Sequence, residues 1–166
     1  AVISRNIERH RDTKPLILRH PHSLRHILVI GSGPAGRLGS MQLGKLGKEV
    51  TLIEKNHIAG TCLNEGCMVI CAVTDITKFI DSNNKFNNYG FLKSQIEISY
   101  EKIVEKIVET QEMLRELNQM ENESVGNNII YGEASIDGQT VNVNGESFEY
   151  ENLLIATGAR PFIPNR

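Results

Sequence analysis

One stretch of the sequence, residues 27–54, constrains the fold more than any other. It begins with four apolar residues, which predict a buried strand over 27–30. Three glycines in the spacing G-x-G-x-x-G follow this strand directly: Gly31, Gly33 and Gly36. A second apolar strand ends on the acidic residue Glu54, about 20 residues beyond the glycines, as a dinucleotide-binding fingerprint requires. The stretch therefore predicts a βαβ unit that binds a dinucleotide.

The three glycines of this fingerprint have different physical roles. Gly31 permits a tight turn out of the strand, and Gly33 lets a pyrophosphate approach the backbone because it has no side chain. Gly36 lets the following helix pack closely on the strand. The alternative interpretation is a glycine-rich turn in an ordinary βαβ unit, but the ordered series of strand, glycines, helix, strand and acid favours dinucleotide binding.

A helix is expected over 34–46, immediately after the glycines. Pro34 suits a first helical turn, and Gly47 suits the residue that caps the helix at its carboxyl end. This helix, which begins Pro34-Ala35, would present free N–H groups and a positive dipole end to the phosphates. Glu54 can accept hydrogen bonds from a ribose diol.

Length and composition limit the class of protein. The 166 residues suffice for one domain, and a net charge of -2 gives no indication of a nucleic-acid or acidic-membrane partner. No apolar run approaches the roughly 20 residues of a membrane span. Three cysteines, two of them close together, do not make a secreted disulfide scaffold, so we expect a cytoplasmic protein with redox or metal chemistry.

The two ends of the chain are expected to lie outside the domain. Residues 1–26 are basic and rich in histidine, and they predict a flexible leader or linker, with a transit peptide as the alternative. His20, His22 and His26 could bind a metal in principle, but no cysteine partners support this. Two prolines near the carboxyl end predict an exit linker over 161–166.

A pair of cysteines forms the second motif, in the run Gly60-Thr61-Cys62-Leu63-Asn64-Glu65-Gly66-Cys67. If Cys67 opens a helix that runs to about residue 80, Cys62 lies just before or within its first turn, and the helix dipole lowers the pKa of a thiol there. Such a pair could close a small disulfide loop. A metal half-site and inert thiols are the alternatives, but C-x4-C without a second ligand pair is a poor zinc signature.

Two segments of opposite character follow the cysteines. Residues 81–90 are polar and rich in Asn, and we expect a loop there. From Tyr100 to about Asn122, apolar residues at helical spacing predict a long amphipathic helix. A coiled-coil partner helix is the rival interpretation, but the pattern lapses at Gln111.

The last third of the chain predicts strands joined by short turns. A strand over 129–131 is expected to run parallel to the first two. Asp137-Gly138 and Asn144-Gly145 are strong hairpin signals and predict a small antiparallel meander, with strands over 133–136, 140–143 and 147–150. A final parallel strand is expected over 153–156, with Thr157-Gly158 as the turn on the ligand side. The fold class is therefore α/β, a Rossmann-like parallel sheet with an inserted meander.

Three motifs together resemble the N-terminal FAD-binding part of the pyridine nucleotide-disulfide oxidoreductases. They are the glycine fingerprint with Glu54, the cysteine segment from Gly60 to Cys67, and the run Leu154-Ile155-Ala156-Thr157-Gly158-Ala159-Arg160-Pro161. The cysteine segment is the most specific, and it is most similar to the dihydrolipoamide dehydrogenase branch. The resemblance begins near His26 and implies an FAD-binding domain with a redox disulfide over 27–160.

The resemblance also implies roles for individual residues. Cys67 would face the flavin ring as the charge-transfer thiolate, and Cys62 would be the thiol that attacks a disulfide substrate. The implied chemistry is thiol–disulfide exchange coupled to a two-electron flavin step. The residues implied to contact FAD are Gly31, Gly33, Pro34, Ala35, Gly36, Glu54, Lys55, Gly60, Thr61, Cys62, Cys67, Ala134, Ala156, Thr157 and Gly158.

Two features depart from the family pattern. The family usually follows the second cysteine with an apolar residue, then Pro, Ser or Thr, and Lys, whereas this chain has Met68-Val69-Ile70-Cys71. Cys71 would share a helical face with Cys67, and we expect a small buried hydrophobe there, with a third redox thiol as the alternative. Family members are also much longer, and nothing here resembles their nicotinamide-binding and dimerisation domains.

The expected function is the FAD-binding, disulfide-bearing part of a flavoprotein disulfide oxidoreductase. The resemblance implies a small dithiol or disulfide substrate, and NAD(P) bound by a domain absent from this sequence. It also implies a homodimer or a complementary chain, with no metal, nucleic acid or membrane partner. The alternatives are a degenerate, non-catalytic FAD-binding module, an enzyme similar to glutathione or mercuric reductase, and a subunit with a different electron acceptor.

Overall fold

The computed structural model describes residues 26–160 and 162–164. Residues 1–25 of the predicted leader, with His20 and His22, and residues 161 and 165–166 of the predicted exit linker lie outside this part of the chain. The elements in chain order are β1 (His26–Ile30), α1 (Pro34–Lys45), β2 (Glu49–Glu54), α2 (Gly60–Asn64), α3 (Cys67–Asn88), α4 (Tyr100–Ser124), β3 (Asn128–Tyr131), β4 (Ser135–Asp137), β5 (Thr140–Val143), β6 (Glu146–Glu149) and β7 (Asn152–Ile155). No helix within the described residues is long and apolar enough to cross a membrane.

A parallel sheet of four strands forms the centre of the fold, in the order β3-β2-β1-β7. Every neighbouring pair is parallel, so the expected directions of the first, second, third and last strands are confirmed. A separate antiparallel sheet, β4-β5-β6, is inserted between β3 and β7. The predicted α/β class with a small meander is therefore confirmed.

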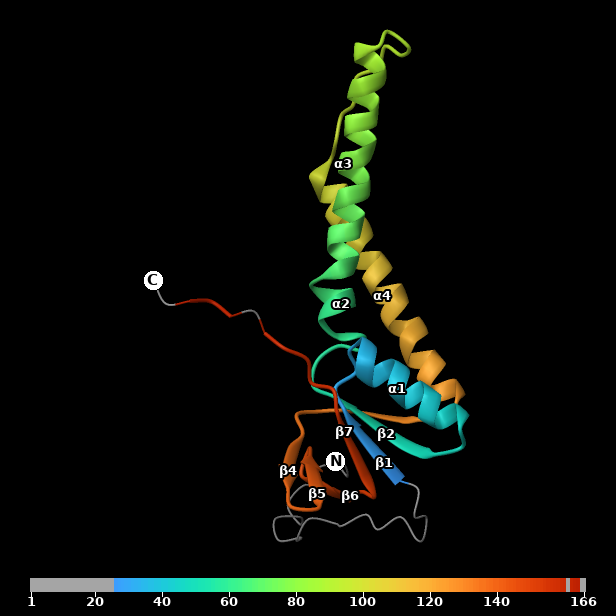
Figure 1. Ribbon diagram of the computed structural model, residues 1–166, viewed down its shortest axis with the longest axis vertical. Helices are drawn as coiled ribbons and strands as arrows, with labels where there is room; N and C mark the ends of the chain where they lie inside the picture. The colour runs from blue at the N-terminus through green and yellow to red at the C-terminus, as the bar shows by residue number, and fades with distance from the viewer. Residues whose placement is uncertain (1–25, 161, 165–166) are drawn as a thin grey trace, which may run out of the picture.

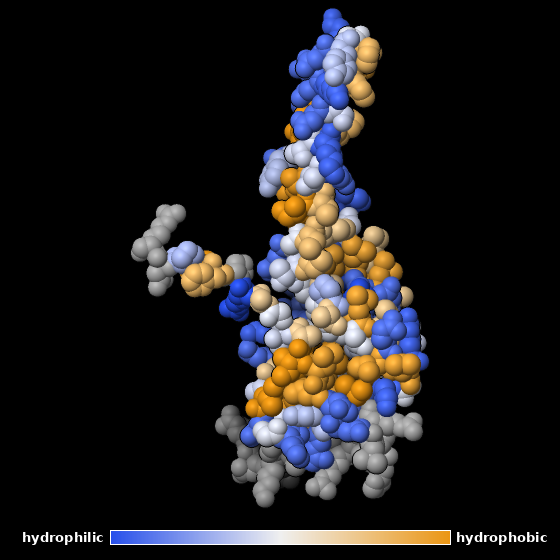
Figure 2. Space-filling view, in the orientation of Figure 1, coloured by the Kyte–Doolittle hydropathy of each residue, from blue (hydrophilic) through white to orange (hydrophobic). Residues whose placement is uncertain are grey.

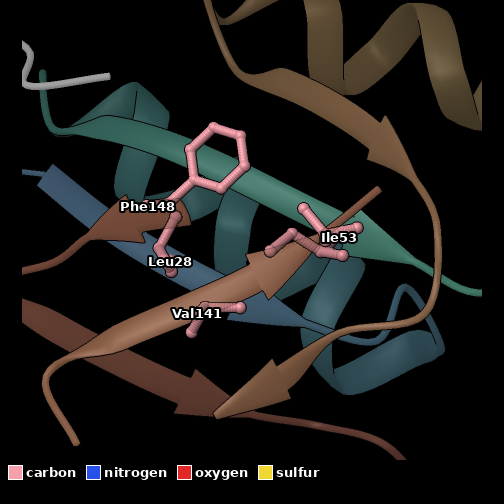
Figure 3. Close-up of a cluster of buried hydrophobic side chains, with 5 residues drawn as sticks. Leu28, Ile53, Val141 and Phe148 are labelled. Atoms are coloured by element: carbon pink, nitrogen blue, oxygen red, sulfur yellow. The ribbon is translucent and has the colours of Figure 1, made fainter. Parts of the chain in front are cut away.

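Both faces of the two central strands, β1 and β2, are covered, which explains why these strands are mostly apolar. On the face toward α1, the buried side chains are Ile27, Val29, Val50 and Leu52. On the other face, strand side chains meet those of the meander in a second cluster: Leu28, Ile53, Val141, Val143 and Phe148 (Figure 3). The alternation of side chains along each strand divides the two clusters.

The helices between β2 and β3 form a long hairpin that projects away from the sheet (Figure 1). The predicted loop over 81–90 is wrong, because α3 continues to Asn88. The segment after α3 folds back and satisfies the Asn side chains: Ser94 donates from its hydroxyl to the buried Asn83, and its N–H donates to Asn87 Oδ1 at 2.9 Å. These tertiary hydrogen bonds override the weak helix propensity of Asn.

The predicted strand over 140–143 is confirmed as β5, whereas β4 and β6 begin and end one or two residues from the predicted positions. Val143 pairs with Glu146, so the loop between β5 and β6 contains only Asn144 and Gly145. Both residues have positive φ, +53° and +82°, as the favoured two-residue hairpin turn requires. The turn was predicted from its residues. Its closing pair, Val143 and Glu146, starts β6 at Glu146, and the strand ends at Glu149, which pairs with Thr140.

Candidate functional site

The glycine loop follows β1 and lies against the chain at the carboxyl end of β7. Gly31 has φ +96°, and a Cβ at this position would lie 2.4 Å from the carbonyl oxygen of Ala156. The N–H of Ala156 in turn donates to the carbonyl of Ile30 at 2.8 Å. The predicted site residues Ala156 and Thr157 therefore lie directly against the first glycine.

The other two glycines have opposite surroundings. A Cβ on Gly36 would lie 1.8 Å from the carbonyl oxygen of Gly31, so the first turn of α1 packs on the loop without room for a side chain. A Cβ on Gly33, the residue before α1, would meet nothing within 4 Å. The space at Gly33 is open toward the N-terminus of α1, where Pro34 and Ala35 begin the helix. This is the arrangement that a pyrophosphate group needs.

Glu54 is buried at the end of β2 and holds the glycine loop in place. Its Oε2 accepts from the N–H of Ser32 at 2.8 Å and from the Ser32 hydroxyl at 2.5 Å, and its Oε1 accepts from the N–H of Asn56 at 2.8 Å. A carboxylate has about four acceptor positions, so one on Oε1 is left for a ribose hydroxyl. Ser32 was not among the predicted site residues, and its only sequence signal is its place beside the fingerprint glycines.

Lys55 and Ala134 are two further predicted ligand contacts, the first directly after Glu54 and the second between β3 and β4. Lys55 forms an exposed ion pair with Glu133, at 2.6 Å, and this ammonium holds the pKa of Glu133 below its usual range. Ala134 packs against the hydrophobic cluster under the meander. Binding of a cofactor by either residue stays a prediction.

The cysteine segment is attached directly to the glycine loop. The N–H of Ala59 donates to the carbonyl of Ser32 at 3.0 Å. Gly60 has φ +58°, and a Cβ there would lie 2.8 Å from the Cα of Gly33. The start of α2 and the start of α1 therefore share one small volume, with Thr61 exposed beside it.

The two cysteines of the motif lie on separate helices. Cys67 opens α3 as predicted, but Cys62 lies in the short helix α2, and Glu65 and Gly66 separate the two. Of the two expected positions, just before α3 or within its first turn, Cys62 therefore occupies the first, on a helix of its own. A Cβ on Gly66 would lie 2.9 Å from the carbonyl oxygen of Thr61, so the chain turns sharply between the helices and keeps them in contact.

The three cysteines are free thiols, and Cys62 does not have the lowered pKa that its expected helix position suggested. A hydrogen bond with Cys67 raises the pKa of the Cys62 thiol most, followed by burial and by the charges of Cys67 and Cys71. The charges of Cys67 and Cys71 raise the pKa of Cys62 because a thiolate beside it disfavours a second negative charge. No group of three or more His, Cys, Asp or Glu side chains in the described residues is arranged to hold a metal ion.

Cys71 is exposed on α3, and so is Cys67. The preferred interpretation of Cys71 as a small buried hydrophobe is therefore wrong. Its helical position one turn after Cys67 was predicted from the spacing and is confirmed by the continuous helix.

The helix α4 fixes the position of α2. Gln111 is buried and donates from Nε2 to the carbonyl oxygens of Leu63 and Asn64, at 2.9 and 3.0 Å. Arg115 donates to the side-chain oxygen of Asn64 at 2.9 Å. These polar contacts satisfy the carboxyl end of α2. The lapse of the apolar pattern at Gln111 was the only sequence signal for this contact.

Comparison with known proteins identifies the family. The model of the pyridine nucleotide-disulphide oxidoreductases matches residues 25–166. The chain belongs to this family. Within it, dihydrolipoyl dehydrogenase of Staphylococcus aureus is 30% identical over 152 residues, which cover 83% of this chain and 31% of that protein. An uncharacterized protein of Methanocaldococcus jannaschii is 35% identical over 137 residues, covering 80% and 31%.

Solved structures agree on the fold. The HOCl-induced flavoprotein disulfide reductase RclA from Escherichia coli superimposes with a TM-score of 0.67 at 24% identity, covering 84% of this chain and 29% of that one. The family resemblance and the Rossmann-like fold of the FAD-binding part of disulfide reductases are thus confirmed. The chain spans about three tenths of the length of these members of the oxidoreductase family.

The crowded surroundings of Gly36 and the open surroundings of Gly33 predict different effects of an added methyl group on stability. Gly36→Ala forces a Cβ onto the Gly31 carbonyl oxygen and should lower the free energy of unfolding by about 1–3 kcal/mol. Gly33→Ala places its Cβ in open space and should change it by less than about 0.5 kcal/mol. Urea unfolding followed by circular dichroism measures both. Equal losses in the two variants would contradict the packing described for this family fingerprint.

The coupling between the thiols predicts the pH dependence of Cys62 alkylation. Because Cys67 raises the pKa of Cys62, Cys67→Ala should lower that pKa and move the midpoint of Cys62 alkylation to lower pH. Peptide mass spectrometry after timed iodoacetamide treatment measures the rate at Cys62 alone. Cys71→Ala is the matched control and should shift the midpoint in the same direction by less. An unchanged or higher midpoint in Cys67→Ala would contradict the coupling.

Proposed function

We propose that this chain is the FAD-binding, redox-disulfide region of a flavoprotein disulfide oxidoreductase most similar to dihydrolipoyl dehydrogenase. The observation that carries the proposal is the direct attachment of the cysteine segment to the glycine loop, through the Ala59–Ser32 hydrogen bond and the Gly60–Gly33 contact. A thiol pair attached in this way to a glycine loop of the kind that binds dinucleotides supports the proposal. Family membership and the similarity to dihydrolipoyl dehydrogenase support the same assignment.

The residues of the loop fit FAD. The open space at Gly33 and the N-terminus of α1 would hold the pyrophosphate, and Glu54 would accept one ribose hydroxyl on Oε1. Ala156 and Thr157 would border the cofactor on the other side of the loop. When bound, FAD supplies a two-electron carrier that thiols alone do not provide.

The thiols of the chain would perform the exchange. Cys62, which is hydrogen-bonded to Cys67 in the reduced state, attacks one sulfur of a substrate disulfide as a thiolate, and its proton goes to the substrate thiolate that leaves. The first substrate thiolate leaves, and a mixed disulfide forms on Cys62. The Cys67 sulfur then attacks Cys62, which releases the second substrate thiolate and forms a Cys62–Cys67 disulfide. The reverse sequence oxidises a dithiol.

Further partners are proposed from the family relationship. The substrate would be a small dithiol or disulfide and the distant electron partner NAD(P), bound outside this chain, in a cytoplasmic enzyme. A homodimer or a complementary chain is supported by apolar side chains exposed along the helical hairpin (Figure 2), among them Ile70, Val73, Phe79, Phe86, Val104 and Val108. An apolar cavity of about 350 Å³ between α3 and α4 lies on the same hairpin.

A second candidate is a non-catalytic FAD-binding module. The observation that favours it is Cys71, which stands where the family pattern has Lys. The two candidates differ in whether Cys62 and Cys67 exchange electrons with bound flavin.

Titration with FAD tests the cofactor site. The chain should quench FAD fluorescence with a defined dissociation constant and keep a visible flavin spectrum after gel filtration. Gly33→Ala should weaken the affinity by about tenfold, because its methyl group occupies the space intended for the pyrophosphate. Lys78→Ala, on the exposed surface of α3, is the control and should bind normally. A wild-type chain that cannot be loaded with FAD would refute the proposed function.

Anaerobic reduction distinguishes the redox region from the non-catalytic module. Adding a dithiol to the FAD-loaded chain should produce a long-wavelength absorbance shoulder, because a thiolate beside oxidised flavin donates charge to it. Cys67→Ser should abolish the shoulder and retain FAD, whereas Cys71→Ser should retain both. If Cys67→Ser keeps the shoulder, the proposed role of Cys67 is wrong. If neither the wild type nor any variant shows a shoulder, the interpretation as a non-catalytic module is correct.

A further inference from the structure

Cys71 is a nucleophilic group that the proposed exchange does not use. It is exposed on α3, one helical turn after the equally exposed Cys67. Side chains on a helix lean toward its N-terminus, so Cys71 leans over the turn that Cys67 begins. The two thiols therefore form a short stripe that leads back toward α2.

Cys62 lies on α2, the helix that precedes this stripe. The connection between the helices is tight, since a Cβ on Gly66 would lie 3.7 Å from the Cα of Cys62. Gln111 binds the carboxyl end of α2 and keeps Cys62 beside the first turns of α3. The charge of Cys71 also contributes to the raised pKa of Cys62, as expected when the two groups are neighbours.

We propose that Cys71 is a second resolving thiol, which forms a disulfide with Cys62 in competition with Cys67. This inference rests on the proposed exchange chemistry at Cys62. In the step, the Cys71 thiolate attacks the Cys62 sulfur of a mixed disulfide, the bond to the substrate sulfur breaks, and the substrate leaves as a thiolate. The dithiol of the chain is oxidised by two electrons, and the bound disulfide is reduced by two.

Cys62 is proposed as the partner of both thiols because the geometry of an intact helix disfavours a disulfide between Cys67 and Cys71. Their Cβ atoms are about 5–6 Å apart at a helical spacing of four residues. A disulfide needs Cβ atoms about 3.5–4.5 Å apart, so an intact helix keeps these two apart. Cys62 lies on a separate helix, so the helical repeat does not fix its distance from either thiol. A Cys62–Cys71 disulfide would store two oxidising equivalents and leave Cys67 as a free thiol.

Disulfide mapping in a glutathione redox buffer tests the proposal on the full chain. Cys67→Ala, equilibrated with reduced and oxidised glutathione and quenched in acid, should contain an internal Cys62–Cys71 disulfide, identified by peptide mass spectrometry. Its transient glutathione adduct on Cys62 should disappear at least about tenfold faster than the adduct in Cys67→Ala/Cys71→Ala, because the second thiol is present at a high effective concentration. Circular dichroism verifies that each variant is folded.

Two further variants separate this proposal from the proposed function. Cys62→Ala should form no internal disulfide, and Cys71→Ala should form the Cys62–Cys67 disulfide of the proposed exchange. If Cys67→Ala retains glutathione on Cys62 with Cys71 free, the second resolving thiol is refuted even when Cys71→Ala closes its own disulfide. If Cys71→Ala alone fails to close, the exchange at Cys67 is what fails, and the Cys62–Cys71 bond still supports the role of Cys71.

Discussion

The fold depends on the bonding of one buried residue, Ser32, at the centre of the glycine loop. Its N–H and hydroxyl donate to Glu54 at the end of β2, and its carbonyl accepts from Ala59 before α2. A buried polar group without partners costs about 1–3 kcal/mol, so this arrangement strongly favours one loop conformation. Because the same residue joins β1, β2 and α2, the cofactor loop and the cysteine segment are positioned together.

The parts of the fold that are encoded locally could be predicted from the sequence. Mostly apolar runs of three or four residues, interrupted only at Thr51, located the parallel strands, because a strand buried on both faces has little polar alternation. Asn144-Gly145 located a hairpin, since both residues readily adopt positive φ. Gly31 and Gly36 predicted the close packing of a βαβ unit, because a side chain at either position would clash with neighbouring backbone atoms.

The remaining features depend on contacts between distant segments, which spacing alone does not reveal. The extension of α3 to Asn88 needs Ser94, which satisfies the Asn side chains from outside the helix. The separate helix α2 needs Gln111 from α4, some 48 residues along the chain, to satisfy its carboxyl end. The pKa of Cys62 went in the opposite direction to the expectation because neighbouring thiols outweigh the dipole of a helix to which Cys62 does not belong.

The raised pKa of Cys62 lowers its thiolate fraction, but it also affects how a mixed disulfide on Cys62 would be resolved. A thiolate becomes a better nucleophile and a poorer leaving group as its pKa rises. In a mixed disulfide between Cys62 and a small substrate, attack on the Cys62 sulfur expels the substrate, whereas attack on the substrate sulfur would have to expel Cys62. The raised pKa disfavours the second route and so would favour closing the proposed disulfide within the chain.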